Sequence, residues 1–273
     1  MRTQSLIFIV ASMTFIFVVG CKVDAYIVYP TSETTPVGSA MDAADDPAIF
    51  IHPTDPIKSV IIGTDKQKGL VIYDTKGAIV HEYAIGRINN VDIRQNVIWN
   101  EEQITVVGGS NRTDNSIVFY QLDAATRQLT PLHQTPILSK VDEVYGFCMY
   151  QAAVLYAFVV GKDGVVEQWK LLPAKDDGLD ATLIRSFDVG SQCEGLVADD
   201  EFGYLYVGEE EVGIWKYNIK DWDGQKSKVQ LIAENKNLKA DIEGLTVYYG
   251  ENGKGYLIAS SQGNHTYAIY ERQ

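Results

Sequence analysis

The sequence predicts an all-β fold, a β-propeller built from four-stranded blades. From Ala44 onward, apolar and polar residues alternate in short runs separated by Gly, Asn and Asp, and no stretch of 12 residues keeps a helical period. Five times, an aliphatic run is followed by a short turn and a second run that ends in an aromatic residue. A repeat of about 50 residues with two visible strands and room for two more is typical of a propeller blade. A β-sandwich, the alternative all-β architecture, gives no reason for so regular a repeat.

The five predicted strand pairs follow one another along the chain. Their closing aromatic residues are spaced by 47, 49, 48 and 53 residues, which indicates a single repeating unit. The pairs are Val60 to Thr64 with Leu70 to Tyr73, Ile104 to Gly108 with Ile117 to Tyr120, Leu155 to Val160 with Val165 to Trp169, Tyr204 to Val207 with Gly213 to Tyr217, and Tyr256 to Ser260 with Thr266 to Tyr270.

Each repeat also opens in a similar way, with a polar residue beside a small residue or a short apolar strand. Because the same position recurs in each blade, these openings predict a ring of polar side chains around one mouth of the central channel. The openings are Asp46-Pro47-Ala48, Asn90-Val91-Asp92, Tyr145-Gly146-Phe147, Glu194-Gly195-Leu196 and Glu243-Gly244-Leu245.

Composition and charge exclude several classes of protein. The 273 residues include 46% hydrophobic and 22% charged residues, an ordinary globular composition that excludes disorder, collagen and coiled coil. A net charge of -13 repels the phosphate backbone of DNA and RNA, so no nucleic-acid partner is expected. An anionic ligand would require something that inverts the local charge.

The N-terminal residues form a separate part of the chain. Arg2 precedes an apolar run from Leu6 to Val19, and small residues then precede Cys21, which resembles a bacterial lipoprotein signal. The run is shorter than the roughly 20 residues that a transmembrane helix needs. We therefore expect a signal peptide (1–20), a lipidated Cys21 with a flexible tether (21–40) and the propeller (41–273). The protein would be anchored to the bacterial envelope through this lipid, with no other membrane contact, or secreted.

Carboxylates are the chemically informative residues. The four histidines are scattered and no serine lies in a nucleophile elbow, so neither a zinc site nor a nucleophilic triad is supported. Carboxylates that share a site suit a hard cation such as calcium. We interpret Asp199 to Glu201 as a solvated turn. Whether Cys148 and Cys193 form a disulfide stays open, because sequence separation does not give the distance between them.

The blade openings and the turns between strands resemble signature motifs of the β-propeller, alkaline, calcium-dependent phytases. The matches occur in family order and run from about Ala40 to Gln273. They are Asp42-Ala43-Ala44-Asp45-Asp46-Pro47-Ala48-Ile49-Phe50, Asn89-Asn90-Val91-Asp92-Ile93-Arg94, Ser110-Asn111-Arg112, Asp142-Glu143-Val144-Tyr145-Gly146-Phe147, Gly161-Lys162, Glu194-Gly195, Ala198-Asp199-Asp200-Glu201, Ile214-Trp215-Lys216, Asp241-Ile242-Glu243-Gly244-Leu245 and Ser260-Ser261-Gln262-Gly263-Asn264.

The resemblance implies a six-bladed propeller that binds several calcium ions and acts as a 3-phytase-like phosphomonoesterase on phytate, myo-inositol hexakisphosphate. It implies catalytic roles for Glu194, Glu210, Asp241, Glu243 and Tyr145. Calcium ligands would be Asp45, Asp46, Asn90, Glu194, Glu210, Asp241, Glu243 and Gln262, and substrate phosphates would contact Lys66, Arg112 and Lys162. Calcium would invert the local charge and hold the attacking water. We expect a monomer with a neutral to alkaline pH optimum.

The sequence departs from the family pattern at Phe50, at Gln67, at Gln95-Asn96-Val97 and at its end. Phe50 stands where the family has tryptophan, and Gln273 follows the fifth repeat, where the family continues into a sixth blade. We therefore expect a C-terminally truncated propeller of about five blades with exposed strand edges. A non-catalytic propeller that binds phytate with calcium, or a protein partner, remains the alternative function. A lactonase-type propeller, with one central metal and few carboxylates, fits this sequence less well.

Overall fold

The computed structural model describes residues 26–174 and 178–272. The propeller lies in one compact unit, Ser32–Gln273, and the described residues 26–31 of the other unit are exposed and carry no regular secondary structure. Cys21 and the predicted signal peptide lie outside the described residues, so both stay predictions. Within the propeller unit, the backbone N–H of Thr35 donates to the carbonyl of Gly77 at 2.7 Å.

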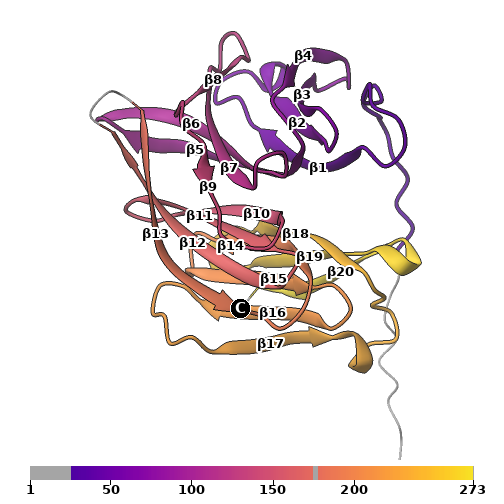
Figure 1. Cartoon of the computed structure of the whole chain (residues 1–273). Helices are drawn as coiled ribbons and strands as arrows, with labels where there is room; N and C mark the ends of the chain where they lie inside the picture. The colour runs from indigo at the N-terminus through magenta and orange to yellow at the C-terminus, as the bar shows by residue number, and fades with distance from the viewer. Residues whose placement is uncertain (1–25, 175–177, 273) are drawn as a thin grey trace, which may run out of the picture. The chain divides into compact units, whose positions relative to one another are not determined.

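Five antiparallel sheets follow one another along the chain, and each sheet is one blade (Figure 1). Blade 1 contains β1 (Ala44–Phe50), β2 (Val60–Asp65), β3 (Gly69–Asp74) and β4 (Ile79–Ala84). Blade 2 contains β5 (Ile88–Trp99), β6 (Glu102–Asn111), β7 (Ser116–Leu122) and β8 (Leu129–Pro131), and β9 (Ile137–Leu138) also pairs with β7. Blade 3 contains β10 (Val144–Gln151), β11 (Leu155–Gly161), β12 (Val165–Pro173) and β13 (Leu179–Asp188).

Blades 4 and 5 complete the described part of the propeller. Blade 4 contains β14 (Cys193–Asp199), β15 (Tyr204–Glu209), β16 (Gly213–Asn218) and β17 (Lys226–Leu231). Blade 5 contains β18 (Ile242–Tyr249), β19 (Gly255–Ser261) and β20 (Thr266–Glu271), so it has three strands among the described residues. The all-β propeller prediction and its five strand pairs are confirmed.

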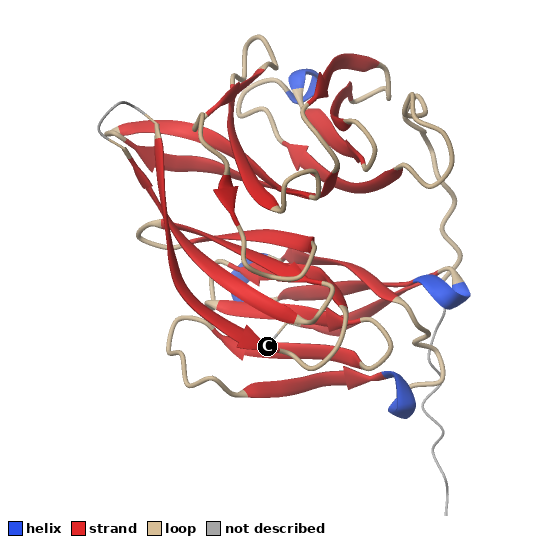
Figure 2. Ribbon diagram, viewed as in Figure 1, coloured by secondary structure: helices blue, strands red, loops and turns tan. Residues whose placement is uncertain are grey.

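The helical content is confined to short 3-10 turns in the described residues (Figure 2). These turns are η1 (Pro56–Lys58), η2 (Ile232–Glu234), η3 (Glu251–Gly253) and η4 (Gln262–Asn264). Among the described residues, no helix has the length and apolar character that crossing a membrane requires.

The first strand of each blade lies nearest the axis. These strands, β1, β5, β10, β14 and β18, contact one another in that order around the channel. The core consists of four hydrophobic clusters, each between two consecutive blades. Between blades 1 and 2, for example, Phe50 and Ile62 pack with Val91 and Val107. This arrangement explains the alternation in the sequence, because successive residues of a strand face the two neighbouring blades.

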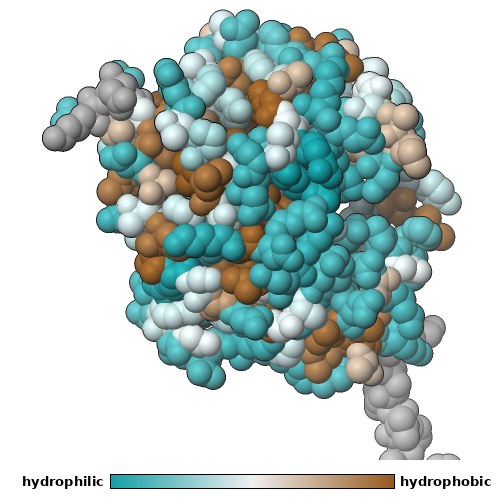
Figure 3. All heavy atoms as spheres, in the orientation of Figure 1, coloured by the Kyte–Doolittle hydropathy of each residue, from teal (hydrophilic) through white to brown (hydrophobic). Residues whose placement is uncertain are grey.

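The two terminal blades each have one face without such a cluster. On blade 5, the face opposite Leu257 and Ala259 carries the exposed side chains of Tyr256, Tyr267 and Ile269. Elsewhere, hydrophilic residues cover most of the face shown in Figure 3, and hydrophobic residues appear in separate patches. Cys148 and Cys193 are both buried, and both are free thiols.

The turn at Asp199 to Glu201 corrects the sequence interpretation, because it is not simply solvated. The Asp199 carboxylate is fully buried and its Oδ2 lies 3.0 Å from the Arg272 guanidinium, which is itself buried. Asp200 pairs with Arg94, whose Nε lies 2.8 Å from Oδ2 of Asp200. Cationic partners distant in sequence therefore balance these charges, and the alternation pattern around the turn gave no sign of them.

Candidate functional site

The first strand of each blade has a β-bulge at the same position. The bulges lie between Ala44 and Pro47, Ile88 and Val91, Val144 and Phe147, Cys193 and Leu196, and Ile242 and Leu245. A bulge adds a residue to one strand and redirects its side chains. We call the bulged residues the inner ring: Asp45 and Asp46, Asn89 and Asn90, Tyr145 and Gly146, Glu194 and Gly195, and Glu243 and Gly244.

The glycines of the inner ring allow consecutive bulges to contact each other. A Cβ added to Gly146 would lie 1.9 Å from the Glu194 carbonyl oxygen, and a Cβ added to Gly195 would lie 1.9 Å from the Glu243 carbonyl oxygen. Only glycine fits at such a distance. Gly244, in the same position on blade 5, has its nearest atom 4.0 Å away.

A second set of site residues comes directly after the second strand of each blade. Each backbone N–H of this set donates to a carbonyl just before the bulge of the same blade, at 2.7 to 3.0 Å. The set therefore lies at the same end of the channel as the bulges. We call it the outer ring: Lys66, Arg112, Lys162, Glu210 and Gln262.

Glu194 lies at the centre of the inner-ring contacts. Its Oε1 accepts a hydrogen bond from Nδ2 of Asn89 at 2.7 Å, and the Tyr145 hydroxyl also bonds to this carboxylate. Burial, followed by the negative charge of Asp45, raises the pKa of Glu194 to about 8. Burial also raises the pKa of Tyr145, with the Glu194 charge as the next cause.

The two aspartates of blade 1 differ in their contacts. Asp46 is partly buried, and its Oδ2 accepts a hydrogen bond from the backbone N–H of Val91 at 3.0 Å. Burial raises the pKa of Asp46 to about 7. Asp45 lies 3.1 Å from Nζ of Lys66 and also accepts from Nδ2 of Asn89, at 3.3 Å. Burial nevertheless raises the pKa of Asp45.

The carboxylates of blades 4 and 5 are held by amide groups. Nε2 of Gln192 donates to both oxygens of Glu210, at 3.0 and 2.8 Å, and Nε2 of Gln262 donates to Oε1 of Glu243 at 2.8 Å. Burial raises the pKa of both glutamates. The negative charge of Asp241, which lies just before β18, adds to this effect at both glutamates.

The cations lie on blades 1 to 3 and already contact carboxylates. Arg112 donates through Nε to Oε1 of Glu143 at 2.7 Å, and Nζ of Lys162 lies 3.3 Å from the same oxygen. Nζ of Lys162 lies 5.3 Å from the centre of the Tyr145 ring, and Cζ of Arg112 lies 6.0 Å from it. Lys66 contacts Asp42 as well as Asp45.

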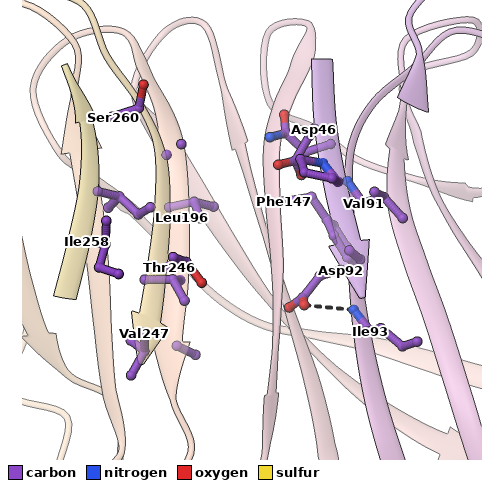
Figure 4. Close-up of a pocket in the computed structure, with 18 of the residues that line it drawn as sticks. Asp46, Val91, Asp92, Ile93, Phe147, Leu196, Thr246, Val247, Ile258 and Ser260 are labelled. Atoms are coloured by element: carbon purple, nitrogen blue, oxygen red, sulfur yellow. Dashed lines mark hydrogen bonds between the residues drawn. The ribbon is translucent and has the colours of Figure 1, made fainter. Parts of the chain in front are cut away.

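A cavity of about 730 Å³ extends along the channel from the inner ring, and no outer-ring residue lines it. In Figure 4, one wall carries Thr246, Val247, Ile258 and Ser260 of β18 and β19, and the other carries Asp46, Val91, Asp92 and Ile93. Further along the lining, Arg94 lies 2.8 Å from Oδ2 of Asp92 and from Oδ2 of Asp200. The cavity thus has carboxylates at the inner ring and, beyond them, an ion-pair cluster of Arg94 with Asp92 and Asp200.

The donor set of the rings fits a hard cation. Its carboxylates are buried or partly buried and their pKa values are raised, which is the behaviour of acidic groups that lack enough positive charge nearby. All of the donors are oxygen atoms, as calcium prefers. In the part of the chain that the structure describes, no three His, Cys, Asp or Glu side chains are already arranged around a common ion position. Instead, amide groups and Lys66 contact these carboxylates.

Comparison with known proteins identifies the family. A sequence model described as phytase matches residues 2–273. The chain belongs to the phytase family. A 3-phytase of Bacillus subtilis strain 168 is 46% identical over 249 residues, and this match covers 89% of the chain and 65% of the relative. The chain therefore spans less than two thirds of the length of this phytase.

A solved structure supports the fold alone. It is a protein of unknown function from Desulfotomaculum acetoxidans DSM 771, with a TM-score of 0.55 and 12% identity over 85% of this chain and 70% of that chain. The family resemblance seen in the sequence motifs is confirmed by the phytase match. The roles assigned to individual residues stay predictions.

The structure brings all of the predicted phosphate and calcium residues to one end of the channel. It adds three that the sequence analysis did not assign: Asn89, Glu143 and Gln192. Asn89 is the first bulged residue of blade 2, equivalent to Asp45 and Glu194.

Proposed function

We propose that this chain hydrolyses phosphomonoester bonds of phytate with calcium as its cofactor. The observation that carries the proposal is the pair of rings: cationic side chains and clustered carboxylates occupy equivalent positions of successive blades, in a chain of the phytase family. Phytate has many negative charges, so its site must offer cations despite the net charge of -13.

Lys66, Arg112 and Lys162 would bind phosphate oxygens. They lie on three successive blades, so a substrate with several phosphates would contact more than one of them. Arginine offers a planar fork of donors that matches phosphate, and lysine offers a compact charge. The Tyr145 hydroxyl, beside Glu194, would keep its proton at neutral pH because burial raises its pKa, and it would donate to a phosphate oxygen.

Several carboxylates would hold calcium. The proposed ligands are Asp45, Asp46, Asn90, Glu194, Glu210, Asp241, Glu243 and Gln262. When bound, calcium supplies charge neutralisation for the phosphate and lowers the pKa of a water molecule. The chain's own residues orient the phosphate at the rings and hold the carboxylates in place through Asn89, Gln192 and Gln262.

The decisive experiment measures phosphate release from phytate with calcium and with excess chelator. We expect release only with calcium, and a loss of about 100-fold or more in Glu194→Gln. Glu102→Gln is the matched control, because Glu102 is exposed and lies at the end of β6 away from Arg112. Calcium-dependent binding of phytate without release would favour a non-catalytic binding propeller instead.

We also propose that Cys21 is lipidated, that the protein is held at a bacterial envelope by this lipid, and that it is a monomer. The support is the apolar run from Leu6 to Val19 and the small residues before Cys21. Labelled fatty acid should be incorporated into the chain but not into Cys21→Ser. Size exclusion with light scattering tests the monomer.

A further inference from the structure

Each cation of the outer ring contacts a carboxylate that is open to solvent. Nζ of Lys66 lies 2.9 Å from Oδ2 of Asp42, whose side chain is 89% exposed. Nε of Arg112 donates to Oε1 of Glu143 at 2.7 Å, and Lys162 contacts the same oxygen; the Glu143 side chain is 41% exposed. One oxygen of Glu143 thus has the two cationic partners that an oxygen of a bound phosphate would have.

The chain places Glu143 in this position with some backbone strain. Its φ of 50° lies in the left-handed region, which is unfavourable for a residue with a Cβ. The carbonyl groups of Asp142 and Glu143 both accept from the backbone N–H of Lys162, so the strained turn is fixed to the outer ring. Strain that the surrounding structure maintains is common at functional sites. The position of this carboxylate is therefore set by the fold.

The side chains of Arg112 and Lys162 have contacts besides the Glu143 carboxylate. Arg112 also donates through NH1 to Oδ1 of Asn89 at 3.2 Å, and its backbone N–H donates to Arg87 at 2.8 Å. Both cations lie over the Tyr145 ring. Departure of Glu143 would leave the two cations in place with an open pair of donors.

We propose that Glu143 is an internal anion that occupies the phosphate position of Arg112 and Lys162 until a substrate phosphate displaces it. This inference rests on the proposed function. Because any phosphate must displace the Glu143 carboxylate, every phosphate binds this one position more weakly by the same factor. A single inorganic phosphate, which depends on this position alone, is thereby kept out, whereas a polyphosphorylated substrate has further contacts such as Lys66 that maintain its binding. Glu143 thus lowers the occupancy of this position by free phosphate product.

The test is a calorimetric titration of the calcium-free protein with inorganic phosphate. Glu143→Gln keeps the shape and removes the charge, and we expect it to bind phosphate about tenfold more tightly. Asp142→Asn makes the same charge change at the neighbouring exposed residue and should alter the affinity by about twofold or less, because exposed charges are screened. Glu143→Ala should change the affinity in the same direction as Glu143→Gln.

Several outcomes would overturn the inference. Equal or weaker phosphate binding in Glu143→Gln would mean that Glu143 positions the cations. An equal gain in Asp142→Asn would mean that long-range charge alone is responsible, and no phosphate binding by any variant would also refute it. With phytate and calcium, Glu143→Gln should lower KM and the inhibition constant of phosphate.

The two proposals can fail separately. The titration needs neither calcium nor turnover. Tighter phosphate binding in a protein that never releases phosphate from phytate would contradict the proposed function and leave Glu143 as the internal anion. Phosphate release from phytate, together with unchanged phosphate binding in Glu143→Gln, would support the proposed function and contradict the role of Glu143 as the internal anion.

Discussion

Nδ2 of Asn89 lies 2.7 Å from Oε1 of Glu194, although the two residues are 105 positions apart in the chain. They belong to the bulges of β5 and β14, on blades that are not neighbours. The same amide group reaches Oδ1 of Asn90 at 2.8 Å. Asn89 therefore connects the inner ring across the channel, and its amide is the hydrogen-bond donor that a buried glutamate requires.

Removal of this amide should destabilise the protein. In Asn89→Ala the Glu194 carboxylate loses a buried donor, which costs about 1–3 kcal/mol in free energy of unfolding at neutral pH. Urea unfolding measures the change. Asn237→Ala is the control, since Asn237 is exposed, and it should change stability by about 0.5 kcal/mol or less. Equal stability of the two variants would contradict the role given to Asn89.

Stability without calcium should fall as pH rises. Asp46 has a pKa of about 7 in the folded protein against an ordinary value of 3.8, and Glu194 about 8 against 4.5. Between these limits the folded state binds more protons than the unfolded chain, so the free energy of unfolding decreases with pH. In the presence of chelator, we expect a lower midpoint of urea unfolding at about pH 8 than at about pH 5. The midpoint should depend less on pH in Asp46→Asn.

Addition of calcium should reverse this trend. A cation that binds only the folded, deprotonated site stabilises it by mass action, and most strongly at the higher pH. Thermal unfolding with and without millimolar calcium measures the difference. Greater stabilisation at acid pH than at alkaline pH would count against carboxylate ligands.

Two glycines in equivalent positions should respond differently to alanine. Gly195→Ala places a Cβ 1.9 Å from the Glu243 carbonyl oxygen, so the two bulges must separate. Overpacking of this kind costs about 1–3 kcal/mol or more. In Gly244→Ala the nearest atom to the added Cβ is 4.0 Å away. This variant should lose at least about 1 kcal/mol less stability than Gly195→Ala. Chemical denaturation of both variants tests the comparison.

The ion-pair cluster beyond the rings should be essential for stability. Arg94 pairs with Asp92 of its own strand and with Asp200 of the next blade but one. Arg94→Met leaves two partly buried carboxylates without their cation, which costs about 3–5 kcal/mol. Lys58→Met, which removes only an exposed pair at 4.0 Å with Asp55, should cost about 0.5 kcal/mol or less. A small effect in both variants would show that the cluster is dispensable.

The sequence was sufficient for the second and third strands of each blade. Their alternation is local, and the polar openings mark where the first strands begin. The outermost strands were not identified: β8 has three residues, and β17 begins with the exposed segment Lys226 to Lys228.

The bulges could not be predicted, because a bulge is a property of the pairing between two strands and not of one segment. The contact of Asn89 with Glu194 was therefore not foreseen. The charges of Asp199 and Asp200 were misread for a related reason. Their partners, Arg272 and Arg94, come from other blades, and burial of a charge depends on such distant partners.

The outer ring places one residue per blade on the same backbone hydrogen bond, whatever its side chain is. Lysine, arginine, glutamate and glutamine all occupy this position, and in each case the backbone N–H donates to a carbonyl just before the bulge of the same blade. The scaffold therefore separates backbone geometry from side-chain chemistry. A change of ligand preference in such a protein requires only an exchange of side chains between positions that already exist, so cation, carboxylate and amide could be permuted around the channel while the blades keep their packing.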